Sequence, residues 1–159
     1  MRSLLLVIFG TVVGVLIHTA MAQSNNSGVL QLNHVGLAVD DFDESLAFYT
    51  GTLGFEEAFR VNDDAGNLRL AYLRVSDRTF IELAPATAEQ PAGLTHFGIQ
   101  VADVEAVAAM FQSRGAHPGT VFTGFTNAIL SFMPDPQGVQ IELSEYPPDS
   151  LPGRALAGR

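Results

Sequence analysis

The feature that most constrains the fold of this chain is an internal duplication of its sequence. Residues 32–41 (LNHVGLAVDD) are echoed by residues 94–103 (LTHFGIQVAD). Further along, residues 80–83 (FIEL) are echoed by residues 140–143 (QIEL). The period is too long for a short solenoid repeat, so it indicates two copies of one module.

A histidine and a glutamate recur at matched places in the two copies. His34 and Glu82 are separated by 82 − 34 = 48 positions, and His96 and Glu142 by 142 − 96 = 46 positions. A lone histidine at a strand start is more often structural than a ligand. Four matched residues are harder to attribute to chance, so we treat them as one candidate site.

Each copy predicts the order strand, helix, strand, strand, strand. The alternating and turn patterns predict strands at 34–39, 55–61, 68–75, 79–84, 95–101, 120–123, 128–133 and 139–144. Asp43 and Asp103 are the expected helix N-caps, and Gly51, Gly54 and Gly115 the expected helix stops. The sequence therefore predicts an α+β domain in which paired βαβββ modules form a curled, cup-like mixed sheet with helices outside.

The phase of the strands places the four candidate residues on one face of this sheet. Side chains alternate between the faces of a strand, so Val35 and Leu37 lie opposite His34. In each of the four strands that carry a candidate residue, the histidine or glutamate lies on the face opposite the aliphatic side chains. Gly36 and Gly98, beside the two histidines, leave space in the concave face.

A divalent metal site is the interpretation that this placement favours. Buried carboxylates are costly unless they are paired or bound to a metal, and two neutral imidazoles with two carboxylates balance a divalent charge. His34, Glu82, His96 and Glu142 are the expected ligands for Zn, Ni, Co, Mn or Fe. Binding is expected to fall at low pH as the histidines and then the carboxylates protonate. No residues for an organic cofactor are identified.

The two ends of the chain are expected to lie outside the domain. Residues 1–22 read as a secretory signal, with Arg2, an apolar run and an Ala-Met-Ala cleavage pattern, although an uncleaved anchor is the alternative. Residues 23–30 form a polar leader. The domain is expected at 31–146, with modules 31–84 and 94–146, and 147–159 as an unstructured tail. The sequence thus predicts a bacterial protein exported to the periplasm or secreted, without a membrane attachment after cleavage.

The composition excludes several kinds of chemistry and partner. The formal net charge of −9 disfavours nucleic acid and anionic membrane surfaces. The chain has no Cys, which excludes thiolate and disulfide chemistry, and all eight of its basic residues are Arg, so Schiff-base chemistry on Lys is excluded as well. The expected partner is a small-molecule substrate.

These residues resemble the vicinal oxygen chelate superfamily, which includes glyoxalase I, methylmalonyl-CoA epimerase, extradiol dioxygenases and bleomycin-resistance proteins. The resemblance covers residues 32–146 and includes the opening at His34, the Ile-Glu-Leu strands and the Asp-Pro-Gln-Gly turn at 135–138. In the glyoxalase and epimerase branches the matching positions bind metal, which stabilises an enediolate or enolate of a vicinally oxygenated substrate. The resemblance implies that Glu82 or Glu142 moves the proton.

The resemblance leaves the branch and the assembly open. Glyoxalase I usually has an Arg shortly after its first histidine, and methylmalonyl-CoA epimerases usually have Gln at the position of Glu82. Gln137 occupies the place of a Tyr expected in extradiol dioxygenases, and the sequence offers no histidine suited to stand behind the ligands. The alternatives are a metal-dependent lyase or isomerase, a metal-free binding protein and, third, a dioxygenase. The site is expected either within one chain or shared across a homodimer.

Overall fold

The computed structural model describes residues 27–158, so the expected signal peptide lies outside the described residues. The strands form one sheet in the order β2-β3-β4-β1-β5-β8-β7-β6. They are β1 (Val29–Val39), β2 (Glu56–Asn62), β3 (Leu68–Arg74), β4 (Phe80–Pro85), β5 (Gly93–Val101), β6 (Phe122–Thr123), β7 (Ile129–Pro134) and β8 (Gln140–Glu145). The helices are α2 (Phe42–Ala47), the π-helical turn η1 (Phe48–Thr52), α3 (Val104–Ser113) and α4 (Leu151–Ala157).

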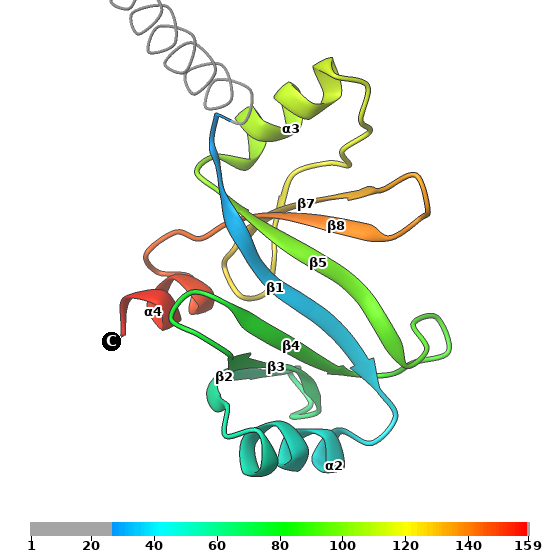
Figure 1. Cartoon of the computed structure of the whole chain (residues 1–159), viewed down its shortest axis with the longest axis vertical. Coiled ribbons are helices and arrows are strands. Elements are labelled where there is room, and N and C mark those ends of the chain that lie inside the picture. The colour runs from blue at the N-terminus through cyan, green and yellow to red at the C-terminus, as the bar shows by residue number, and fades with distance from the viewer. Residues whose placement is uncertain (1–26, 159) are drawn as a thin grey trace, which may run out of the picture.

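The sheet consists of two equivalent halves that meet at its centre. β1 pairs in parallel with β4, and β5 pairs in parallel with β8, while the other neighbours within each half are antiparallel. The halves join where β1 runs antiparallel to β5 in the middle of the curled sheet (Figure 1). This topology confirms the predicted α+β fold of paired βαβββ modules.

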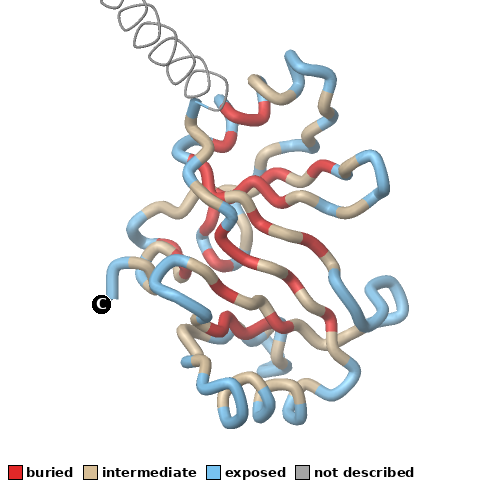
Figure 2. Tube along the Cα trace, viewed as in Figure 1, coloured by how far each residue is buried: buried red, intermediate tan, exposed pale blue. Residues whose placement is uncertain are grey.

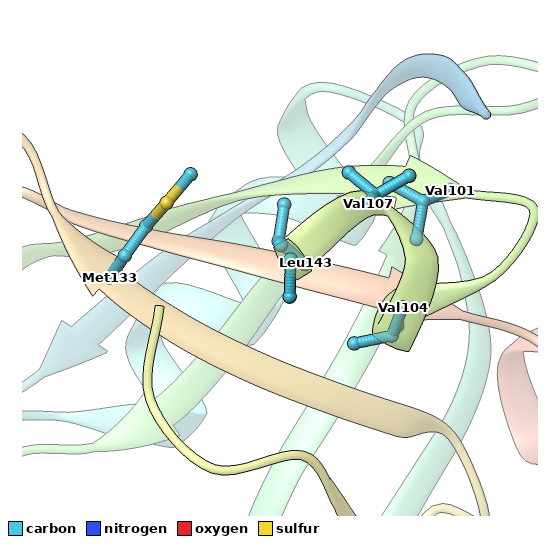
Figure 3. Packing of buried hydrophobic residues seen from close by; sticks show 6 residues of the cluster. Val101, Val104, Val107, Met133 and Leu143 are labelled. Carbon is cyan, nitrogen blue, oxygen red and sulfur yellow. The ribbon is translucent and has the colours of Figure 1, made fainter. Parts of the chain in front are cut away.

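The second module buries its aliphatic face under α3, and Figure 3 shows this packing. Val104 and Val107 from the helix lie in one cluster with Val101, Met133 and Leu143 from the strands. Apolar surface removed from water supplies the main stabilisation here. Along the second half of β1, Val35, Leu37 and Val39 are half-buried, while the residues on the other face, His34, Gly36 and Ala38, are buried (Figure 2).

The helix boundaries confirm one predicted cap and correct another. Asp103 caps α3 by accepting a hydrogen bond from the backbone N–H of Ala106 at 2.8 Å. The cap of α2 is Asp41, which accepts from the N–H of Glu44, and not Asp43 as predicted. An N-cap side chain reaches the N–H group two or three residues ahead, and Asp43 already lies inside the helix.

The C-terminal segment forms a helix, so the prediction of an unstructured tail is wrong. Ser150 caps α4 by accepting from the N–H of Gly153, and the N–H of Leu151 donates to the carbonyl of Thr126. Ala155 and Leu156 pack against the buried cluster of Leu70, Tyr72 and Phe80. The helix is short, and tertiary packing rather than a periodic pattern holds it in place.

Two further observations complete the fold. The strand predicted at 120–123 is shorter and pairs with β7 only at Phe122–Thr123. Before it, the N–H of Gly119 donates to the carbonyl of Phe132. Within the described residues, no helix has the length and apolar character needed to cross a bilayer.

Candidate metal centre

The strand register builds the site from two matching rows of residues that cross the centre of the sheet. In each row a glycine from one central strand lies between a histidine from the other central strand and a glutamate from the outer parallel strand. The rows are Glu82–Gly36–His96 and His34–Gly98–Glu142. Each row draws on both modules, so the site is complete only when β1 and β5 pair.

The two glycines give each histidine ring the space that it occupies. A Cβ atom at Gly36 would collide with the ring of His96, and a Cβ atom at Gly98 would collide with the ring of His34. Both glycines have ordinary backbone angles, so the close approach of the rings, and not a special conformation, requires glycine. This confirms that small residues beside the histidines leave room in the concave face.

The four predicted residues converge within a single chain. Nε2 of His34 lies 3.0 Å from Nε2 of His96 and 3.6 Å from Oε1 of Glu142. Nε2 of His96 lies 3.6 Å from Oε2 of Glu142. One ligand atom each from His34, Glu82 and His96 lie within 4.8 Å of one another.

Hydrogen bonds behind His34 determine which of its nitrogens faces the site. The amide nitrogen of Asn33 donates to the carbonyl of Arg78 at 2.9 Å, which orients its oxygen toward Nδ1 of His34, 3.3 Å away. The hydroxyl of Tyr146 also donates to this oxygen, at 2.8 Å. An amide oxygen only accepts hydrogen bonds, so Nδ1 of His34 carries the proton and the lone pair of Nε2 faces the centre.

The other three residues have comparable partners. Nδ1 of His96 lies 2.8 Å from the hydroxyl of Thr95. Ser144 donates to Glu142 at 2.6 Å, and Tyr72 lies opposite Glu82 in the β3–β4 register. Such outer partners fix the orientation of side chains that bind a metal.

Burial changes the protonation of all four residues. It lowers the pKa of His34 to about 3, helped by the nearby His96, and lowers the pKa of His96 to about 4. Burial raises the pKa of Glu82 to about 7, and burial with the charge of Glu82 raises the pKa of Glu142 to about 8. The carboxyl groups therefore protonate before the histidines as the pH falls, which reverses the order expected from the sequence.

The donor set fits one divalent cation. Two atoms that each lie about 2.1 Å from the same ion are at most about 4.2 Å apart. The measured separations of 3.0–3.6 Å among His34, His96 and Glu142 lie below this limit. Neutral imidazoles and carboxylates suit Zn, Ni, Co, Mn and Fe, and a cation would offset the cost of burying the two carboxylates.

The centre lies in a cavity of about 580 Å³ that is lined by residues of both modules. Glu82, His96 and Glu142 contribute to its wall, together with two tyrosines that the sequence analysis missed, Tyr72 and Tyr146. Neither tyrosine occupies the position of Gln137, where the resemblance to extradiol dioxygenases would place a Tyr. Tyr146 follows the last predicted strand, and Tyr72 is one apolar residue among several in its strand, so neither belongs to a motif.

Comparison with known proteins identifies a matching family and several similar proteins. Residues 31–143 match the family model described as Glyoxalase/Bleomycin resistance protein/Dioxygenase superfamily. A 2-epi-5-epi-valiolone epimerase of Actinomyces sp is 30% identical over 152 residues, covering 76% of this chain and 81% of the relative. A probable lactoylglutathione lyase of Vibrio cholerae is 31% identical over 121 residues, covering 69% of this chain and 86% of the relative.

A solved structure shows the same arrangement of strands and helices. The crystal structure of methylmalonyl-CoA epimerase from Mycobacterium tuberculosis superposes with a TM-score of 0.65 at 29% sequence identity. The match covers 77% of this chain and 91% of that one. The similar proteins thus include both lyases and epimerases.

Proposed function

The chain belongs to the glyoxalase/bleomycin resistance protein/dioxygenase superfamily, and from this premise we propose that it is a metal-dependent lyase or isomerase. Its substrate is a small molecule with oxygens on neighbouring carbons, and its reaction moves a proton at one of these carbons. The observation that carries the proposal is the convergence of two histidines and two glutamates in one buried centre.

The residues of the chain supply the proton transfer. When bound, a divalent cation would act as a Lewis acid toward the substrate oxygens and make the adjacent C–H bond more acidic. Glu82 and Glu142 are the candidate bases, because both carboxylates belong to the centre and one that the substrate displaces from the cation would accept a proton more readily. A hydrogen bond from Ser144 orients the carboxylate of Glu142, and Tyr72 lies opposite Glu82 on the neighbouring strand.

Two other functions within the superfamily make different demands on the site. A metal-free binding protein does not need four converging ligands with their hydrogen-bonded partners. A dioxygenase with a facial triad leaves ligand positions open for oxygen, which a second carboxylate crowds. Tyr72 and Tyr146 in the cavity wall are the one observation that favours a dioxygenase.

Metal content tests the first part of the proposal. We expect elemental analysis to find about one ion per chain after incubation with Zn, Ni, Co, Mn or Fe and removal of the excess. His96→Ala removes one ligand and is expected to weaken binding strongly, whereas His117→Ala changes an exposed loop residue and serves as the control. If the wild-type protein binds none of these metals, it is a metal-free binding protein.

Isotope exchange tests the second part. With any substrate found in a metabolite screen, we expect deuterium uptake from deuterated water without consumption of oxygen. Glu82→Gln and Glu142→Gln should lower turnover by about 10²–10⁴-fold with a smaller effect on ligand binding. Glu105→Gln, on the exposed side of α3, is the matched control. Turnover that requires oxygen and Fe(II) would assign the chain to the dioxygenases instead.

We also propose that the protein is exported, with cleavage after Ala22. The support is the positive start, the apolar run and the Ala20-Met21-Ala22 pattern. The intact mass of protein from the periplasmic or secreted fraction tests this proposal. A mature chain that retains Met1 would contradict it.

A further inference from the structure

The cavity has a second polar feature away from the candidate metal centre, the side chain of Arg69. Of the described residues that line the cavity, Arg69 is the only Arg or Lys, although three of the lining residues are Asp or Glu. Arg69 lies on β3 and its side chain is exposed. A single positively charged side chain among acidic lining residues needs an explanation.

The guanidinium of Arg69 is held in place but keeps its hydrogen-bonding capacity. Its carbon lies 4.7 Å from the centre of the Phe125 ring, which reaches it from the second module. Stacking on a ring face leaves the edge of the guanidinium, with its N–H groups, available to a carboxylate. No carboxylate of the described residues forms an ion pair with Arg69.

The nearest acidic group in the cavity wall is already engaged. Asp63 lines the same cavity, but its oxygens accept hydrogen bonds from the backbone N–H groups of Ala65 and Asn67 and from the side-chain amide of Asn67. These bonds hold Asp63 within its own turn and are the main reason that its pKa is lowered, with a smaller contribution from the charge of Arg69. The guanidinium therefore remains available to a bound molecule.

The strand gives the approximate spacing between the backbone of Arg69 and the backbone of Tyr72, and both residues line the cavity. Arg69 precedes Tyr72 by three residues on β3, which corresponds to about 10 Å along the strand. The ring of Tyr72 lies 5.4 Å from the ring of His34, and Tyr72 is opposite Glu82 in the β3–β4 register, so it marks the centre. A molecule that occupies both places is elongated.

We infer that Arg69 determines substrate specificity by binding a carboxylate at the end of the substrate opposite its vicinal oxygens. This inference rests on the proposed function, because the vicinal oxygens occupy the metal centre. The substrate class is then an elongated, vicinally oxygenated carboxylate. Phe125 contributes by holding the guanidinium over its ring. Two N–H groups of the guanidinium can then bind the carboxylate.

A pair of hydroxamic acids tests the inference without knowledge of the substrate. A hydroxamate chelates a metal through two neighbouring oxygens. Octanohydroxamic acid and suberic monohydroxamic acid have chains of equal length and differ by a terminal carboxylate. Each compound is titrated into the Co(II)-loaded protein, and the visible spectrum of cobalt reports its binding. The ratio of the two dissociation constants gives the contribution of the carboxylate to the affinity.

The wild-type protein should bind suberic monohydroxamic acid about tenfold more tightly than octanohydroxamic acid. One charge-assisted bidentate contact supplies a difference in affinity of this size. Arg69→Gln should abolish this preference while leaving the affinity for octanohydroxamic acid and the cobalt spectrum unchanged. Arg60→Gln, an exposed arginine paired with Glu57 on β2, should retain it.

The outcomes distinguish this inference from the proposed function. Equal affinities in the wild-type protein, or a preference that survives Arg69→Gln, would overturn the role of Arg69 and leave the metal centre intact. Failure of both hydroxamates to bind or to change the cobalt spectrum would overturn the proposed function, and the inference with it. An unchanged unfolding curve for Arg69→Gln shows that the fold is preserved.

Discussion

Replacing Gly98 by alanine tests the geometry of the site most directly. A Cβ atom at this position would lie 2.6 Å from Nε2 of His34 and closer still to two other ring atoms. Carbon and nitrogen atoms that are not bonded normally stay about 3.5 Å apart or more. The ring and the added methyl group therefore cannot both keep their positions.

The ring of His34 has little freedom to move away. Its side chain is completely buried, Asn33 and Tyr146 surround Nδ1, and the ring of Tyr72 lies 5.4 Å from it. Overpacking of this kind in a well-packed interior costs about 1–3 kcal/mol. Displacement of one ligand and its partners should also weaken metal binding by about 10–100-fold.

Two measurements check the Gly98→Ala prediction. Urea unfolding of the metal-free protein gives the free energy of unfolding, and a titration with Co(II) gives the metal affinity. Gly51→Ala is the matched control, because nothing lies within 4 Å of a Cβ atom there. We expect that control to retain full stability and metal affinity.

The result that would refute the reasoning is a Gly98→Ala protein with unchanged stability and unchanged metal affinity. The ring of His34 would then have another position open to it, and the row His34–Gly98–Glu142 would not determine where this ring lies. A loss of stability without a loss of metal affinity would separate packing from ligation. It would show that His34 is not required for binding.

Three further predictions concern protonation, packing and orientation. Burial raises the folded-state pKa values of Glu82 and Glu142 above the ordinary 4.5, so the stability that they contribute is complete below pH 4.5 and is lost as the pH rises through about 7–8. The lowered pKa values of the two histidines make stability rise with pH, and this opposite effect ends near pH 6.5. The free energy of unfolding of the metal-free protein should therefore fall between pH 6.5 and about 8. Urea titrations measure this fall, and an increase would contradict the raised pKa values. Leu143→Ala should lower that free energy by about 2–5 kcal/mol, because Leu143 is fully buried under α3, and a smaller loss would show that the cluster collapses around the gap. Tyr146→Phe removes the hydroxyl that lies beside Asn33, so Co(II) titration should show about tenfold weaker binding, and unchanged binding would exclude a role in orienting the ligand.

The fold and the four central residues could be predicted because the sequence is duplicated. The matched positions of His34 and His96 gave the strand phase twice, and a period of two residues assigns a face without knowledge of the tertiary structure. The same duplication located Glu82 and Glu142. The geometry brings all four together, and their chemical roles remain predictions.

Other parts of the site depend on tertiary contacts that carry no local pattern. The segment 147–159 contains prolines and glycines without periodicity, and Ser150 as a cap with Pro152 just after it was the available signal for α4. Arg69 and Phe125 meet only because the two modules face each other across the cavity. The raised carboxyl pKa values likewise follow from burial, which neighbouring residues in the sequence do not specify.

The arrangement of the two rows has a consequence for how the chain unfolds. Each module contributes one histidine and one glutamate, and these two residues belong to different rows. Neither module alone therefore places a histidine and a glutamate on the two sides of one glycine. A cation bound by all four residues would act as a crosslink between the halves, stabilising only the state in which both are folded. The metal-loaded chain would then unfold as one cooperative unit. The metal-free chain depends for that coupling on the β1–β5 pairing and on contacts such as the packing of α4 against Leu70, Tyr72 and Phe80.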